Sequence, residues 1–304
     1  MKIPFVSFAI VAVAFFPAAV SAQWPDYPVA AVPRTADGKV KMDAPTPRTA
    51  DGKTDFSGVW TLAFRGGAGG RGGGAGRGGR GGPAPNAAGG PPAPPPGPPP
   101  VPELKPGELP LATFGNIGAG IKDGLPLQPW AAELLAKRKA ENSKDNPDAH
   151  CLPLGLMQLH EHPQPRKIAQ MPNLMVIMYE AQAGLRQIFL DGRPLAPKDA
   201  QPWWYGYSVG HWEGNDTLVV ETTGFRDDVW LDVNGSPLTN TGKMTEKFRR
   251  PNFGTLEIDV TVEDPKVYTK PFTVRVNHRL MADTDLIEFI CGENEKSDAH
   301  LVGK

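Results

Sequence analysis

The sequence predicts a mainly β protein in which an antiparallel meander curls into a closed barrel, accompanied by one helix and a long disordered insertion. Three observations support this. Apolar and polar residues alternate with period two after Lys167. Short turn sequences separate these runs, as in successive hairpins. Most of the 35 Gly and 34 Pro crowd into the first half of the chain, which leaves the second half with an ordinary composition.

Nine segments are expected to be strands, the first of them Phe56–Leu62 near the start of the chain. Strands joined in sequence by hairpins form an antiparallel meander, and a meander of this size usually closes, which removes its edges. The other eight segments are Leu174–Ala181, Leu185–Leu190, Tyr207–Trp212, Thr217–Thr223, Met244–Arg249, Thr255–Glu263, Phe272–Met281 and Asp285–Cys291.

A single helix is expected at Pro129–Asn142. Proline suits the first turn of a helix. Trp130, Leu134 and Leu135 can share one face, and basic residues in the later turns favour the helix dipole.

Residues 1–22 have the pattern of a cleavable secretory signal. Lys2 precedes an apolar run, and the small residues Val20 and Ala22 suit a signal peptidase site. We therefore expect a secreted protein, periplasmic or extracellular, although an uncleaved anchor is the alternative. The chain has no later run that could span a bilayer, so no stable membrane insertion is expected. An oxidising compartment favours a disulfide between Cys151 and Cys291, whereas two buried free thiols are the alternative.

The remaining chain divides by composition. Residues 23–54 are expected to be a linker, and it contains the sequence PRTADGK twice. Residues 55–64 hold the first strand, residues 65–128 a disordered insertion rich in Arg/Gly and then Pro/Ala, residues 129–295 the helix and barrel, and residues 296–304 a tail. The 32 basic and 33 acidic residues nearly cancel, so no nucleic-acid partner is expected. The Arg/Gly segment is expected to be a solvated linker that makes at most weak contacts with anionic envelope polymers.

Two signatures resemble known families. Gly58-Val59-Trp60 at the head of the first strand resembles the G-x-W of lipocalin-like barrels. That resemblance implies that the Trp closes one barrel end, with Arg275 or Arg279 against it.

The second signature, Tyr205–Phe225, resembles a motif of exported bacterial proteins of unknown function, G-x-S-x-G-x-W-E-G-D-T-L-V-V-x-T. His211 stands where that family is expected to have Arg, and Asn215 is an extra residue in the turn. The resemblance covers Trp130 to Asn294 and implies no particular activity. Gly206–Gly210 also fits a G-x-S-x-G nucleophile elbow, but the strand pattern continues through it, which disfavours that reading.

Three strands carry titratable residues on apolar rows, and these rows are predicted to face the barrel interior. The residues concerned are His211, Glu246 and His278, with Tyr207 on the row of His211. A carboxylate and imidazoles in such a site can orient a ligand or perform acid–base chemistry. A mutually paired network that only stabilises the barrel is the favoured alternative.

Trp203 and Trp204 form an aromatic loop that suits an apolar or sugar ligand, or that seals one end of the core. His160 and His162 would share a face in an extended chain and are candidate metal ligands, although they lack a third ligand at fixed spacing. A polar loop is the favoured alternative there.

Three functions are consistent with this sequence. The first is an exported lipocalin-like protein that binds a small apolar or amphipathic molecule in the barrel lumen. Its ligand-binding residues would be Tyr207, His211, Glu246, His278, Trp203 and Trp204. The second is a secreted hydrolase or lyase with Glu246 or His278 as base, and the third is a structural envelope protein. No cofactor is predicted.

Overall fold

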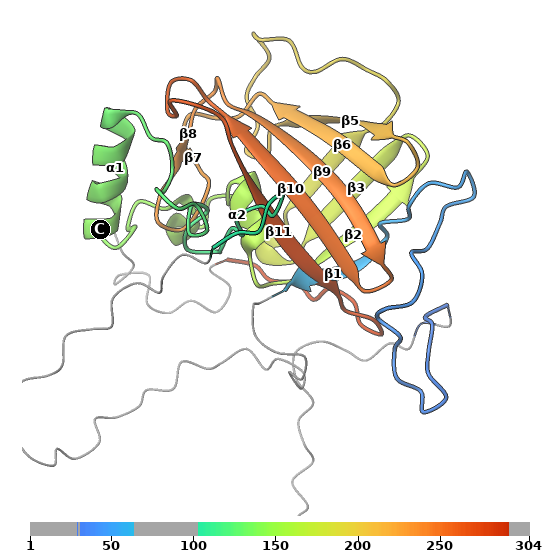
Figure 1. Cartoon of the computed structure of the whole chain (residues 1–304). Helices are drawn as coiled ribbons and strands as arrows, with labels where there is room; N and C mark the ends of the chain where they lie inside the picture. Colours follow the sequence, from blue (N-terminus) through green and yellow to red (C-terminus); the bar gives the residue numbers. More distant parts are fainter. Residues whose placement is uncertain (1–28, 30, 64–102, 292–304) are drawn as a thin grey trace, which may run out of the picture.

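Nine strands close into a barrel in the order β1-β11-β10-β9-β6-β5-β4-β3-β2 (Figure 1). The computed structural model describes residue 29 and residues 31–63 and 103–291. The barrel strands are β1 (Gly58–Leu62), β2 (Arg166–Met171), β3 (Leu174–Tyr179), β4 (Leu185–Phe189), β5 (Tyr207–Glu213), β6 (Thr217–Thr223), β9 (Lys243–Asn252), β10 (Thr255–Glu263) and β11 (Phe272–Leu280). A separate two-stranded sheet pairs β7 (Val229–Trp230) with β8 (Pro237–Leu238).

The predicted mainly β closed barrel is confirmed, with two differences in its strands. β4 and β5 run parallel, so the barrel is mixed instead of wholly antiparallel. The segment Asp285–Cys291, which was expected to be a strand, has no regular secondary structure. Its place beside β1 is taken by β2, which pairs with both β1 and β3.

The interior faces of the later strands follow the predicted alternation. On β10 the residues Leu256, Ile258 and Val262 are at most 1% exposed. The rows that carry Glu246 on β9 and His278 on β11 also face inward. A one-residue shift in register would turn each of these rows to solvent, so burial fixes the pairing.

Two helices lie at one end of the barrel, with α2 between α1 and the strands in Figure 1. α1 (Pro129–Ala140) begins as predicted and ends two residues early, and its Arg138 guanidinium stacks 4.2 Å from the Trp230 ring centroid. α2 (Leu156–Glu161) is buried at every position. It contains His160 and Glu161, so the expectation of an extended chain there is wrong.

The residue before α2 shows how closely this helix packs. A Cβ atom on Gly155 would lie 2.1 Å from the carbonyl oxygen of Trp230. Only glycine allows that approach, and this contact therefore positions α2 as a plug against β7.

Trp60 on β1 is fully buried, and an arginine stacks on it, but not one of those expected. The guanidinium of Arg250, on β9, lies 4.8 Å from the Trp60 ring centroid and donates to the carbonyl oxygens of Asp55 and Phe253 at 2.6 Å. The expectation of Arg275 or Arg279 is wrong. Arg275 instead pairs with a carboxylate on the outer face of the barrel, and Arg279 is exposed.

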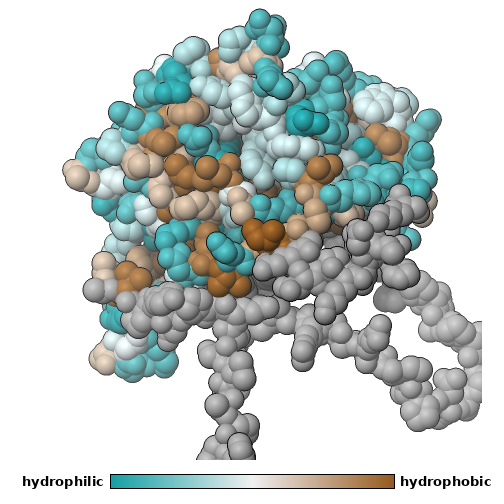
Figure 2. Space-filling model, turned by 180° about the vertical axis from the view of Figure 1, so that it is seen from behind, coloured by the Kyte–Doolittle hydropathy of each residue, from teal (hydrophilic) through white to brown (hydrophobic). Residues whose placement is uncertain are grey.

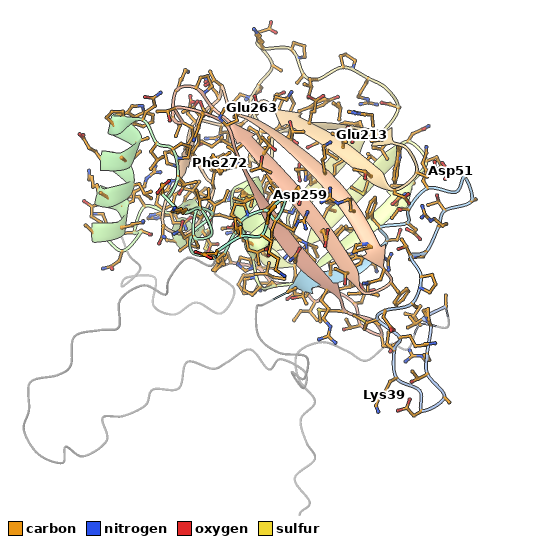
Figure 3. All side chains as sticks on the ribbon, viewed as in Figure 1. Lys39, Asp51, Glu213, Asp259, Glu263 and Phe272 are labelled. Atoms are coloured by element: carbon orange, nitrogen blue, oxygen red, sulfur yellow. A yellow bond between two sulfur atoms is a disulfide. The ribbon has the colours of Figure 1, made fainter. Side chains whose placement is uncertain are left out.

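The two PRTADGK sequences form two turns of the same construction. In each, the Thr backbone N–H donates to the Lys carbonyl four residues later, at 2.8 Å for Thr35 and 2.9 Å for Thr49. The Arg of the first turn pairs with Asp283, and Arg48 of the second pairs with Asp216 at 2.5 Å. The segment expected to be a linker therefore clamps two turns of the barrel. Figure 3 shows Lys39 at the far tip of the first turn.

Part of the predicted disordered insertion is ordered. Residues 103–128 pack against the barrel, with Ile117 fully buried and Ala112 donating its N–H to the carbonyl of Arg275 at 3.0 Å. The Arg/Gly and Pro-rich part, the predicted signal at 1–22 and the tail at 296–304 lie outside the described residues.

Cys151 and Cys291 form the predicted disulfide, with their Cα atoms 5.4 Å apart. It ties the chain before α2 to the segment after β11, 140 residues later in the sequence. In the described part of the chain, no helix is both long and apolar enough to cross a membrane. Seen from behind, the surface shows several separate hydrophobic areas among hydrophilic ones (Figure 2).

Candidate functional site

The barrel interior contains a buried ion pair between Arg186 on β4 and Glu246 on β9. Arg186 Nη1 donates to Glu246 Oε1 at 2.9 Å, and Nη2 bonds the other carboxylate oxygen. Burial disfavours the charge on both groups, but the facing charges outweigh it. They raise the pKa of Arg186 and lower the pKa of Glu246 to about 2.

His160 on α2 connects the plug helix to this pair. Its Nε2 lies 2.7 Å from Glu246 Oε1, and its side chain is 1% exposed. Burial lowers the pKa of His160, against the effect of the neighbouring Glu246. A neutral ring donates its Nε2–H to the carboxylate, so this bond anchors α2 inside the barrel without adding a charge.

Arg166 on β2 holds the end of α2. It donates to the carbonyl oxygens of His160 at 2.7 Å and His162 at 2.6 Å, and to Nε2 of His278 at 2.6 Å. A guanidinium only donates, so His278 Nε2 accepts when it bonds Arg166. The same Nε2 also lies 2.8 Å from the carbonyl oxygen of His160, a bond that requires the other tautomer. Burial, and then the charge of Arg166, holds the pKa of His278 well below its usual range.

Ser208 and Gly210 of the Tyr205–Phe225 segment both have structural roles in the barrel wall. Ser208 faces inward and accepts from Nε and Nη2 of Arg186, both at 3.1 Å. Thr222 on β6 accepts from the same Nη2 at 3.0 Å. A Cβ on Gly210 would lie 2.7 Å from the side chain of Leu190. The segment thus supports Arg186, and Ser208 lies within a strand instead of the strand-to-helix turn that a nucleophile elbow needs.

Glu161 on α2 is the least satisfied group of the plug. The side chain is fully buried, and neither of its oxygens has a hydrogen-bond partner among the described residues. Burial, with a further contribution from Asp232, raises its pKa well above the usual range. The described interior therefore holds the cations Arg166, Arg186 and Arg250 with the carboxylate of Glu246, and burial favours the neutral form of Glu161.

This arrangement gives little support to acid–base catalysis by Glu246 or His278. A carboxylate with a pKa of about 2 is a weak base at neutral pH, and a general base must reach a substrate. Glu246 is fully buried and bonded to Arg186 and His160. The bonds of Glu246 to Arg186 and His160 are typical of a structural core, although Nδ1 of His160 and of His278 are buried without a partner among the described residues.

The other predicted ligand residues lie outside this network. His211 is exposed on the outer face of β5, so its predicted place in the lumen is wrong. The row that faces inward is Ser208, Gly210 and Trp212. Tyr207 faces outward with Trp203, their ring centroids 5.3 Å apart, while Trp204 packs partly against the core.

The two candidate metal ligands do not form a site in this structure. The ring of His162 packs edge-on against Phe114, with centroids 5.0 Å apart, whereas His160 bonds Glu246. Burial, then Arg166, lowers the pKa of His162 to about 4. The described residues contain no group of three or more His, Cys, Asp or Glu placed to hold a metal ion.

The candidate ligand site is a cavity of about 220 Å³ at a seam in the barrel wall. β1 ends at Leu62, and the segment Pro110–Ala112 continues in its place beside β11. This seam cavity is lined mainly by apolar side chains. They include Leu62, Leu104, Leu111, Phe114 and Ala119.

One polar atom in the seam cavity has no partner. Asn277 on β11 lines the cavity, and its Oδ1 is buried without a hydrogen-bond donor among the described residues. Arg275 also lines the cavity, but Asp259 Oδ1 already accepts from its Nε at 2.6 Å. The cavity therefore has mainly apolar walls, and one of its lining residues carries an unpaired buried acceptor.

No known family model matches the chain, and a search of curated proteins finds no relative. The function of this chain must therefore be inferred from the geometry of the site.

Sequence reasoning missed Arg166, Arg186, Glu161 and Asn277. Arg186 is followed by the polar Gln187 in LRQIF, so the sequence alternation does not show which face is buried, and a charged residue is expected on the solvent face by default. One signal was available: Ser208 and Thr222 both stand on inner rows, and polar residues at inner positions indicate a buried polar partner.

Proposed function

We propose that the protein is an exported binding protein that holds a small amphipathic molecule in the seam cavity. The observation that carries this proposal is the apolar cavity with the unpaired Asn277 Oδ1. The barrel lumen is a weaker candidate, because α2 occupies one end and Arg186, Glu246 and His160 bond one another within it.

The volume limits the size of the ligand. A cavity of 150 Å³ accommodates benzene, about 25 Å³ for each non-hydrogen atom. By the same ratio, a cavity of about 220 Å³ takes roughly nine such atoms. Leaving a buried acceptor unpaired costs about 1–3 kcal/mol, so a ligand with one N–H or O–H donor gains over a purely apolar one.

Indole and indene are a matched pair of probes for this site. Both are apolar bicycles of nearly equal size, but only indole has an N–H. Saturation-transfer NMR and calorimetry should show that indole binds with a Kd of about 0.1–1 mM. Indene should bind at least about fivefold more weakly.

Two variants localise the binding. Ala119→Phe fills the cavity and should abolish binding of both probes. Asn277→Leu removes the acceptor at similar volume and should remove the preference for indole. If neither probe binds the folded wild type at millimolar concentration, or if Ala119→Phe binds as the wild type does, the seam cavity is not a ligand site.

The export part of the proposal is supported by the Cys151–Cys291 disulfide, since such bonds persist in oxidising compartments. Fractionation of cells that express the full chain, compared with a chain lacking residues 2–22, tests it directly. Equal cytoplasmic retention of both chains would contradict export.

A further inference from the structure

Three aromatic rings form a row on the outer wall of the barrel, where β4 and β5 run parallel. The Tyr207 ring centroid lies 5.3 Å from those of both Phe189 and Trp203. The Arg193 guanidinium stacks 3.9 Å from the Phe189 centroid and closes the row at that end. We call Arg193, Phe189, Tyr207 and Trp203 the aromatic ledge.

Trp203 is held in the ledge by backbone contacts and is open to solvent. Trp203 donates its backbone N–H to the Gly224 carbonyl at 2.9 Å and forms a parallel bridge with Phe225. A Cβ on Gly224 would lie 3.0 Å from the Trp203 ring, so the indole packs closely against the backbone at a glycine with φ +72°. Trp203 nevertheless remains 39% exposed. A fixed aromatic face that is left in water is typical of a binding surface.

The charges around the ledge select the class of partner. Asp191 pairs with Arg193 through two oxygens, at 2.7 and 2.9 Å, so that end of the ledge has donors and acceptors without net charge. A second such pair lies beside Trp203. The Arg226 guanidinium stacks 4.4 Å from the Trp204 ring centroid and pairs with Asp228 at 2.9 Å. Nucleic acid and anionic membranes require uncompensated positive charge, which these pairs do not provide.

We propose that the aromatic ledge binds neutral hexopyranose chains, as a site separate from the seam cavity. The apolar C–H face of a pyranose ring stacks on an aromatic face, while its hydroxyls bond the neighbouring guanidinium and carboxylate groups. Tyr207 and Trp203, with centroids 5.3 Å apart and ring planes 44° from each other, would contact consecutive sugar units. Paired Arg and Asp side chains at its end match hydroxyls, which both donate and accept hydrogen bonds.

Affinity electrophoresis in native gels tests this proposal. The folded full chain is run through gels that contain hydroxyethyl cellulose, laminarin or dextran, and through a gel without polysaccharide. At least one of these neutral glucans should retard the protein. Saturation-transfer NMR with the matching tetrasaccharide then gives the affinity of a defined ligand.

Trp130 provides a matched control, because it is a tryptophan on α1 that is 46% exposed. Trp203→Ala should weaken binding about tenfold, since aromatic anchors dominate such surfaces, whereas Trp130→Ala should retain it within about twofold. Tyr207→Ala is the second test within the ledge, and thermal unfolding confirms that each variant is folded. Ala119→Phe should leave sugar binding unchanged, which separates this proposal from the seam cavity.

Three results would overturn the proposal. One is the absence of retardation by all three glucans, and another is equal loss of binding in Trp203→Ala and Trp130→Ala. The third is retention of single-stranded DNA or phosphatidylglycerol vesicles, in place of sugars, that depends on Trp203.

Discussion

Replacement of Arg186 by methionine should strongly destabilise the barrel, because it leaves the Glu246 carboxylate buried without its cation. The pair is 1% and 0% exposed, so water cannot replace the lost partner. Breaking a buried pair by removing one partner costs about 3–5 kcal/mol. Ser208 and Thr222 also lose the donor that both accept from. The remaining donors to Glu246 are the neutral ring of His160 and, at 3.5 Å, the Thr222 hydroxyl, and neither compensates the charge.

The double variant Arg186→Met with Glu246→Met separates the cost of a lone buried charge from the value of the pair. Methionine is apolar and adaptable, and such replacements of whole ion pairs are often neutral or stabilising. We therefore expect the double variant to recover at least about 2 kcal/mol relative to Arg186→Met.

Urea unfolding followed by tryptophan fluorescence measures both variants, since Trp60 and Trp230 are buried. For an m-value of about 3 kcal/mol/M, a cost of 4 kcal/mol lowers the midpoint by roughly 1.3 M. A single variant that loses less than about 1 kcal/mol, or a double variant no more stable than the single one, would show that the pair does not organise the interior.

Three further outcomes follow from the buried carboxyl, the disulfide and the packed glycine. The pKa of Glu161 is raised in the folded state, so the unfolded chain releases this proton first, and stability is lost as pH rises above about 4.5. Glu161→Gln should therefore become more stable relative to the wild type as pH increases, by up to about 1.4 kcal/mol per unit in urea titrations, and a difference independent of pH would contradict this. Joint replacement of Cys151 and Cys291 by serine opens a loop of 140 residues, which costs about 5 kcal/mol in the chain-entropy model. Calorimetry should show a fall in Tm of about 15 °C, and a change below about 3 °C would refute the estimate. Gly210→Val should cost about 1–3 kcal/mol through overpacking against Leu190, as measured by thermal unfolding. Gly115→Ala, where a Cβ meets nothing within 4 Å, should cost less than about 1 kcal/mol, and equal losses in the two variants would exclude overpacking as the cause.

The agreement in strand number between prediction and structure arises from two errors that cancel. β2 was missed as a named strand because Arg166 and Lys167 stand at its start, although Arg166 is in fact buried against α2. The segment Asp285–Cys291 has a strand-like composition, but β2 occupies the position beside β1 that closes the barrel. Composition cannot reveal which of two segments obtains a given pairing partner.

The inward face of β5 is a second feature that the sequence did not predict. Tyr207, Val209 and His211 form the more apolar row, yet Ser208, Gly210 and Trp212 face inward. At this place the interior contains the Arg186 head group and the side chains of Ile188 and Leu190, so it accepts a hydroxyl and a glycine better than larger apolar residues. The inner face of a strand is decided by what lies opposite it, and that partner comes from another strand.

The sequence by itself determined the β class, the barrel, the disulfide partners and the inward rows of β9, β10 and β11, because these depend on local alternation and on having only two cysteines. Only the tertiary structure decided that α2 plugs the barrel, that Arg186 neutralises Glu246, and that a cavity opens where β1 ends. These features join residues far apart in the chain, and their energies depend on burial and on distances between side chains, which no local pattern encodes.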